Sequence, residues 1–433
     1  MYAESKPNLS EKNEGMAVLS GCKSYMILHG MIVVGVIFFM KPRLSRYLQR
    51  LSAGVVVACA CTVQAEELNQ RNLNGIALLD TVYGQRGPQD DAMTASVVGS
   101  GVANMNIAWR SQMQRQLRSI RNRVSSLNGG IACEPPVYDG KGGMQSAPPP
   151  YTFWGNAEID RSKLSGDSRA SGYTLNSIGG TAGFAMSPSE GLTVGAAFTG
   201  MHGRLGVKGY GSDASGDLDA YYGTLFARME QGCWDHTLIG SVGFADISLN
   251  RRVHLPHESY STNGSPDGLS FGLMYEVSRS YRLNLDSVAQ AWWQPVFNVS
   301  YIHSRVDSYT ESGSVGALRV GKQESNNVIF GLGARMQGIV GENLFNTPAI
   351  METRLLGKAI TGRRDGRAEV AMPGFDGATT VHGARQGAFG IELGIGMTIP
   401  LGRDYGALIL DCSAEMYSDQ TTVNGVLGYR IDF

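Results

Sequence analysis

The chain has 433 residues and a formal net charge of −1, and only 17% of its residues are charged. This balance excludes a strongly basic nucleic-acid-binding protein and gives no attraction to a bulk anionic surface. No run of about 20 apolar residues predicts a membrane-spanning helix. The 57 glycines suit the inner face of a tightly curved barrel.

Residues 1–65 are predicted to be a targeting region. Residues 41–50 are basic, residues 51–60 are apolar, and Ala65 precedes Glu66 in a small-residue cleavage pattern. The chain is therefore expected to be exported and cut between Ala65 and Glu66.

Two features of this region leave alternatives open. Met40 stands directly before the basic stretch, so it is the expected true start, and residues 1–39 would then belong to an unused upstream start. The residues before Cys59 resemble a lipoprotein cleavage box, which makes lipidation of Cys59 an alternative to cleavage by signal peptidase. Residues 66–91, which follow, are a short mixed segment with turn signals.

Residues 92–130 change to a helical period. An apolar stripe is formed by Met113, Leu117, Ile120, Val124 and Leu127. Arginines cover much of the remainder, namely Arg110, Arg115, Arg118, Arg121 and Arg123. One interpretation is an amphipathic surface helix or a short coiled coil, and a sharper one is a basic rod inside an acidic barrel. Residues 131–150 contain many prolines and glycines and are predicted to be a linker.

Residues 151–433 repeat a pattern in which apolar and polar residues alternate. This is the period of a strand, whose successive side chains point to opposite faces. Twelve such segments are predicted, near 151–162, 174–187, 192–207, 216–230, 235–249, 266–280, 290–304, 325–339, 348–361, 386–401, 405–417 and 421–433. The alternation predicts an all-β transmembrane fold. The even number of strands favours a 12-stranded antiparallel up-and-down outer-membrane barrel, and the preceding helix is predicted to lie in its lumen.

The last strand ends on an aromatic residue. Phe433, Ile431, Tyr429 and Leu427 share one apolar face, and the residues between them are polar or small. An exposed apolar edge would invite aggregation, whereas a closed barrel has no edge. The connections alternate in length, and the long polar ones are expected to be outer loops, at 250–265, 305–324 and 362–385.

The predicted inner faces carry more acids than bases. The acids are Glu158, Glu276, Glu352, Glu392, Asp411 and Glu415. The cations are Arg335, Arg354, Lys358 and Arg430. A narrow lumen of low dielectric focuses such a surplus, so it is expected to hold the arginine-rich helix.

Three short patterns and the order of the elements carry a family resemblance. The tail LGYRIDF at 427–433, the opening FWGNAE at 153–158, the strand PVFNVSYIH at 295–303 and a helix before twelve strands resemble the translocator domain of autotransporters, the type V secretion proteins. The resemblance covers about residues 91–433. It implies a monomeric barrel in the lipid of a Gram-negative-type outer membrane. It also implies periplasmic chaperones and the barrel assembly machinery as partners, with Phe433 and its apolar neighbours as the assembly signal.

The resemblance further implies a helix linked to an exported passenger. Residues 66–91 leave no room for a long β-helical passenger and hold no repeat, so they are interpreted as a short, vestigial passenger or N-terminal segment. Some family members cut themselves at an Asn-Asn pair in the helix. The helix here has Asn104-Met-Asn106 instead, so this cleavage is not carried over from the family.

Two other functions compete with a translocator. A passive or substrate-selective porin would leave the helix outside the lumen or mobile. An outer-membrane hydrolase could use His303 and Ser304, but adjacent strand residues face opposite ways and cannot act on one substrate. The sequence has no metal-ligand spacing and no cofactor fingerprint, so neither is expected. The favoured function is a non-enzymatic barrel that anchors or exports an N-terminal segment at the cell surface.

Overall fold

The computed structural model describes residues 101–127 and most of residues 150–433. The gaps in the second range are 167–169, 210–211, 255–258, 286–287, 314–315, 343–347, 374–377 and 402–405. The targeting region with Met40, Cys59 and the Ala65–Glu66 cleavage site lies outside the described residues. Residues 66–91, the first part of the predicted helix and nearly all of the linker also lie outside them.

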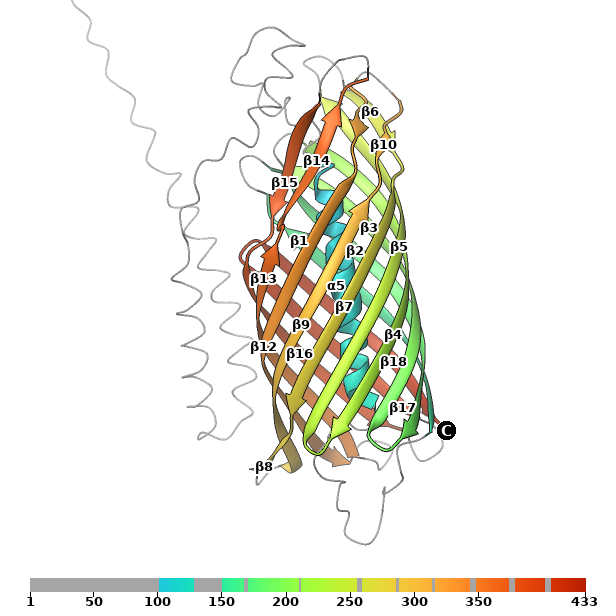
Figure 1. Cartoon of the computed structure of the whole chain (residues 1–433), viewed down its shortest axis with the longest axis vertical. Helices are drawn as coiled ribbons and strands as arrows, with labels where there is room; N and C mark the ends of the chain where they lie inside the picture. Colours follow the sequence, from blue (N-terminus) through green and yellow to red (C-terminus); the bar gives the residue numbers. More distant parts are fainter. Residues whose placement is uncertain are drawn as a thin grey trace, which may run out of the picture. The chain divides into compact units, whose positions relative to one another are not determined.

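Twelve antiparallel strands form a closed barrel around the helix α5 (Asn104–Ser126), as Figure 1 shows. The barrel strands are β1 (Tyr151–Leu164), β2 (Gly172–Ser189), β3 (Leu192–Gly209), β4 (Ser212–Gln231), β5 (Trp234–His254), β7 (Asp267–Arg279), β9 (Val288–Val306), β12 (Gln323–Glu342), β13 (Pro348–Gly362), β16 (Phe389–Pro400), β17 (Ala407–Tyr417) and β18 (Gln420–Asp432). Successive barrel strands pair with each other, and β18 pairs with β1 to close the wall. The predicted fold class is confirmed, and most strands are longer than predicted.

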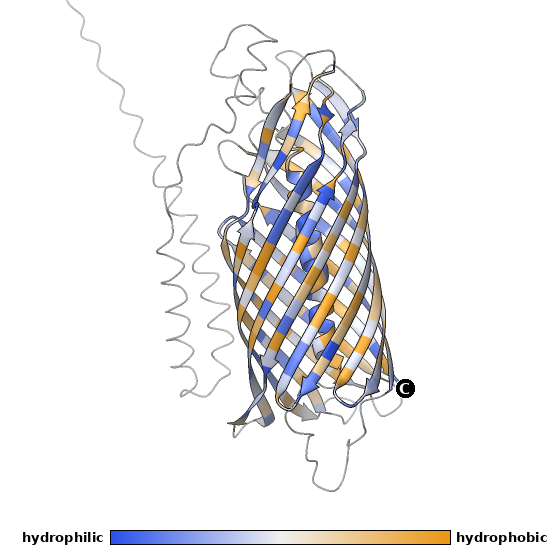
Figure 2. Cartoon of the chain, viewed as in Figure 1, coloured by the Kyte–Doolittle hydropathy of each residue, from blue (hydrophilic) through white to orange (hydrophobic). Residues whose placement is uncertain are grey.

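The wall is two-sided because side chains alternate along each strand. On β7, Phe271, Leu273 and Tyr275 point outward, whereas Met274 and Glu276 are buried on the inner side. Figure 2 shows the same alternation of apolar and polar residues on strands around the barrel. The outward apolar side chains form a belt that suits contact with lipid, and the polar ones line the lumen.

Short strands extend the end of the barrel opposite the C-terminus. They are β6 (Ser259–Gly264), β10 (Tyr309–Thr310), β11 (Arg319–Val320), β14 (Asp365–Ala371) and β15 (Thr379–Arg385). β6 pairs with β5, and the other four form a separate sheet. The prediction of loops over 250–265, 305–324 and 362–385 is therefore wrong in part. Buried apolar side chains stabilise strands there, among them Val320, Val370 and Val381.

The opposite end has tight connections. Gly191 and Gly232 lie in the β2–β3 and β4–β5 turns with φ of +75° and +59°, a region that favours glycine. The strand β8 (Tyr281–Leu285) also lies at this end and pairs with β9. Outer-membrane barrels carry short turns on the periplasmic side and longer connections outside. The extended end is therefore called the outer end here, and the end with Phe433 the periplasmic end.

Within the described ranges, no helix is both long and apolar enough to cross a bilayer.

Candidate functional site in the barrel lumen

The helix α5 fills the lumen from one end to the other. All of its side chains are buried except those of Ser119, Asn122 and Ser126, which are partly exposed. Buried polar residues of a helix need partners, since water is not available to replace a lost hydrogen bond. Glutamines in the middle of α5 find theirs on the wall: Gln112 donates to Ser177 at 2.6 Å, and Gln116 donates to Thr199 at 2.9 Å.

One side of α5 lies directly against the wall at β7. The apolar stripe that includes Met113 and Leu117 faces two glycines of this strand, Gly268 and Gly272. A Cβ added at Gly272 would lie 2.9 Å from Leu117 Cδ1 and 3.1 Å from Met113 Cγ, and one at Gly268 would lie 3.2 Å from Trp109 Nε1. The missing side chains of β7 therefore let the backbone of the helix approach, and the apolar stripe fills that space.

Three of the five arginines of α5 reach carboxylates on the wall. Arg115 forms an ion pair with Asp160, and Arg118 Nη1 lies 2.7 Å from Glu415 Oε2. Arg121 forms an ion pair with Glu392, and its Nε lies 3.7 Å from Glu276 Oε2.

These pairs are shielded from solvent. The side chains of Arg121 and Glu392 are 1% and 0% exposed, so they are screened far less than a surface pair. Such a pair attracts strongly, and removing one partner leaves an uncompensated buried charge.

The other two arginines have no carboxylate partner among the described residues. Arg110 donates to neutral oxygens, at 2.9 Å from Asn327 Oδ1, 2.6 Å from Gln386 Oε1 and 2.5 Å from the carbonyl of Arg363. Arg123 lies over the ring of Trp154, 5.5 Å from its centroid, which is a cation–π contact. The direct partners of these two arginines are therefore neutral groups and an aromatic ring.

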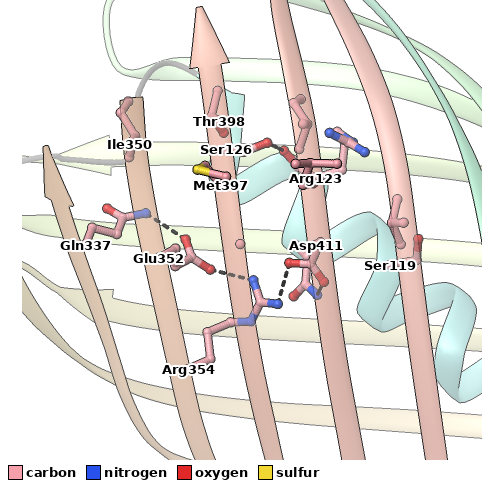
Figure 3. Close-up of a pocket in the computed structure, with 15 residues that line it drawn as sticks. Ser119, Arg123, Ser126, Gln337, Ile350, Glu352, Arg354, Met397, Thr398 and Asp411 are labelled. Atoms are coloured by element: carbon pink, nitrogen blue, oxygen red, sulfur yellow. Dashed lines mark hydrogen bonds and ion pairs between the residues drawn. The ribbon is translucent and has the colours of Figure 1, made fainter. Parts of the chain in front are cut away.

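Much of the acidic surplus is neutralised by the wall itself. Arg354 Nη1 lies 2.6 Å from Glu352 Oε1, and its Nη2 lies 2.5 Å from Asp411 Oδ2. These three residues line a small pocket beside the C-terminal half of α5 (Figure 3). Arg335 Nη2 lies 2.7 Å from Glu276, and Lys358 lies 2.6 Å from Glu392 and 2.8 Å from Glu415. Glu158 accepts a hydrogen bond from Ser119 of the helix at 2.9 Å. The helix therefore joins an ion network that already contains cations of the wall, instead of supplying the only positive charges.

Both ends of α5 are fixed by contacts that the charge pattern did not reveal, although Arg430 itself was predicted on the inner face. At the periplasmic end, Arg228 and Arg430 each donate at 2.7 Å to a carbonyl of the last turn, those of Leu127 and Ser126. Basic groups stabilise this end of a helix, because its final carbonyls have no partner within the helix and carry a negative partial charge. Arg228 is in turn held by Asp235, at 2.7 Å.

At the outer end, two asparagines attach the start of α5 to the wall. Asn104 donates to the carbonyl of Ser171 at 2.6 Å and accepts from the amide of Ala384 at 2.9 Å. Asn106 donates to the carbonyl of Gln323 at 3.0 Å and accepts from Ser304 at 2.8 Å. Of the missed partners, Asp160 and Arg228 were detectable, because Asp160 has the inward parity of Glu158 and Arg228 that of Thr224.

His303 and Ser304 lie on opposite sides of the wall. His303 Nδ1 is 2.7 Å from Asn326 Oδ1 on the exposed face, whereas Ser304 is buried against Asn106 of the helix. The two side chains therefore do not form a catalytic pair. Among the described residues, no three His, Cys, Asp or Glu side chains gather in a way that could hold a metal ion.

The apolar residues of the last strand lie on its outer face. Leu427, Tyr429 and Phe433 are exposed, and Ile431 is partly exposed. The ring of Phe433 meets that of Phe153 edge-on, with centroids 5.9 Å apart, and its amide donates to the carbonyl of Tyr151 at 2.9 Å. The C-terminal residue therefore takes part in the seam that closes the barrel.

A sequence profile of the autotransporter beta-domain family matches residues 153–408, which is more than half of the chain. The protein belongs to this family. Its barrel lies in the outer membrane of a Gram-negative bacterium and is of the translocator type.

One solved structure supports the same fold, and two others match less well. The translocator domain of the autotransporter NalP from Neisseria meningitidis has a TM-score of 0.53 at 13% identity, over 78% of this chain and 99% of that domain. The transport unit of AIDA-I from Escherichia coli has a TM-score of 0.47 at 13% identity, over 72% and 97%. The beta domain of the Bordetella autotransporter BrkA has a TM-score of 0.46 at 15% identity, over 65% and 99%. No curated protein matches the chain.

Proposed function

We propose that this barrel carries the segment before α5 outward through its own lumen and then anchors it at the cell surface. The direction of the helix carries this proposal. Its first residues contact Ser171, Gln323 and Ala384 at the outer end, and its last carbonyls contact Arg228 and Arg430 at the periplasmic end. A chain that runs this way through the lumen delivers the residues before the helix to the outside.

The contacts of α5 supply the anchor. They combine apolar packing on β7, buried ion pairs with β1, β16 and β17, and hydrogen bonds at both ends. The barrel acts without catalytic chemistry in this proposal, because its lumenal polar groups serve the helix. The porin alternative gains no support from a lumen that a buried helix occupies.

The proposal is tested by inserting an epitope tag between residues 66 and 91 and labelling intact cells with antibody. The tag is expected to be accessible, because those residues precede a helix that starts at the outer end. A tag at Gly232, in a periplasmic turn, is the matched control and is expected to react only after the outer membrane is permeabilised. Equal protection of both tags in intact cells would refute the proposed direction.

Assembly of the barrel is proposed to depend on the barrel assembly machinery, which would recognise the outward apolar residues of β18. The surface-labelling assay tests the role of the terminal aromatic residue in this step, in a chain that carries the N-terminal tag and lacks Phe433. Loss of Phe433 removes the edge contact with Phe153 and the amide pairing with Tyr151. We expect less labelled barrel and less heat-modifiable protein. Unchanged amounts of both would argue against a role for the terminal aromatic residue.

A further inference from the structure

A chain of ring contacts runs over the lipid-facing side of the barrel near its periplasmic end. Its members are Trp293, Tyr281, Arg279, Trp234, His236 and Tyr275. Ring centroids of neighbouring aromatic members lie 5.8 Å to 6.5 Å apart, and His236 Nδ1 is 2.7 Å from the hydroxyl of Tyr275. These residues come from β5, β7, β8 and β9, so the cluster spans several neighbouring strands.

Arg279 is the centre of this cluster. Its guanidinium carbon lies 5.3 Å from the ring centroid of Trp234 and 5.1 Å from that of Tyr281. The side chain is exposed, and no ion pair with a carboxylate is found for it in the described part of the chain. Two aromatic rings therefore hold a guanidinium in place, and no described carboxylate pairs with its N–H groups.

The position of the cluster matches the edge of the membrane. Leu238 and Leu273 lie further from the periplasmic turns on β5 and β7, and both are exposed in the apolar belt. Trp234 and Arg279 directly face each other at the strand ends, beyond that belt. Aromatic residues gather at this level in membrane proteins, because one side of the ring meets hydrocarbon and the other meets headgroups.

We propose that Arg279 and its aromatic neighbours form a binding site for the phosphate of a glycerophospholipid in the periplasmic leaflet. A guanidinium presents a planar fork of donors that matches two oxygens of a phosphate. The rings of Trp234 and Tyr281 restrict the fork, so less freedom is lost when a phosphate binds. The acyl chains of the same lipid lie along the apolar belt, which a free anion could not use. This site does not depend on the direction of α5.

The proposal is tested by native mass spectrometry of the whole detergent-solubilised barrel with phosphatidylglycerol. Wild-type protein is expected to retain a lipid molecule that Arg279→Gln releases, with an affinity about tenfold lower, as for loss of a charge-assisted hydrogen bond. Arg161→Gln is the matched control, because Arg161 is exposed on β1 near the outer end and has no ring contact among the described residues. It is expected to retain the lipid.

A second variant separates charge from geometry. Arg279→Lys keeps the positive charge and a long exposed side chain, but it loses the planar fork of donors. We expect this variant to bind the lipid more weakly than wild type. Inorganic phosphate at the same concentration is expected not to displace the lipid. Equal lipid retention by wild type and Arg279→Gln, or full displacement by inorganic phosphate, would overturn the proposal.

Discussion

Removal of residues 101–127 is expected to turn a closed barrel into a steadily conducting, cation-preferring channel in planar bilayers. The helix occupies the lumen along its whole length, so its loss leaves a water-filled path. Wall carboxylates that now face arginines of the helix, such as Asp160, Glu392 and Glu415, would then face that path. Their negative charge concentrates cations inside a narrow pore.

A control separates the open path from its selectivity. In the shortened barrel, replacing Asp160, Glu392 and Glu415 with the corresponding amides is expected to keep the conductance and reduce the preference for cations. Heat-modifiable migration checks that each variant is an assembled barrel. Steady conductance of the intact protein, unchanged by the deletion, would contradict a lumenal helix and favour the porin alternative.

Reversal of a single charge, Arg121→Glu, is expected to loosen the helix in the lumen. The new carboxylate would lie beside Glu392 and near Glu276, both buried. Removing one partner of a buried ion pair costs about 3–5 kcal/mol, and a repulsive replacement costs more. The expected result is fluctuating conductance together with a lower midpoint of thermal unfolding.

Arg110 offers a matched comparison for this effect. It is as buried as Arg121, at 1% exposed, but its partners are neutral oxygens. Arg110→Gln therefore leaves no carboxylate unpaired, whereas Arg121→Gln deprives Glu392 of one of its two cations. Arg121→Gln is expected to raise the conductance fluctuations more than Arg110→Gln does. Equal effects of the two substitutions would show that ion pairing contributes little to holding the helix.

The strands were predictable because alternation is a local signal. Each barrel strand shows its two faces in its own residues, and a register slip would have moved Glu392 from the lumen into lipid. The basic character of the helix was also local. Combining the two patterns was enough to place a helix with arginines inside a barrel that carries acids.

Partner choice was harder to predict, because it depends on contacts between residues far apart in sequence. Glu352 and Asp411 are acids on the correct face, but both form their ion pairs with Arg354 of the wall and not with an arginine of the helix. Arg123 rests on Trp154, and a charge pattern does not reveal a ring partner.

The sheet at the outer end was missed for a similar reason. The strands there are short and flanked by polar residues, so their buried positions do not build a visible period. Val320 on β11 and Val370 on β14, for example, face each other across a pairing that the local sequence does not indicate.

Disulfide crosslinking tests the lumenal position of the helix most directly. A Cβ at Gly272 would lie 3.1 Å from Met113 Cγ, so cysteines at these two positions are close enough to form a disulfide. The double variant Met113→Cys, Gly272→Cys is expected to form the disulfide when outer membranes isolated from cells are oxidised. The variant Met113→Cys, Leu273→Cys is expected to form none, because Leu273 is 42% exposed on the lipid side. Absence of the first disulfide, or equal formation of both, would contradict a helix inside the barrel.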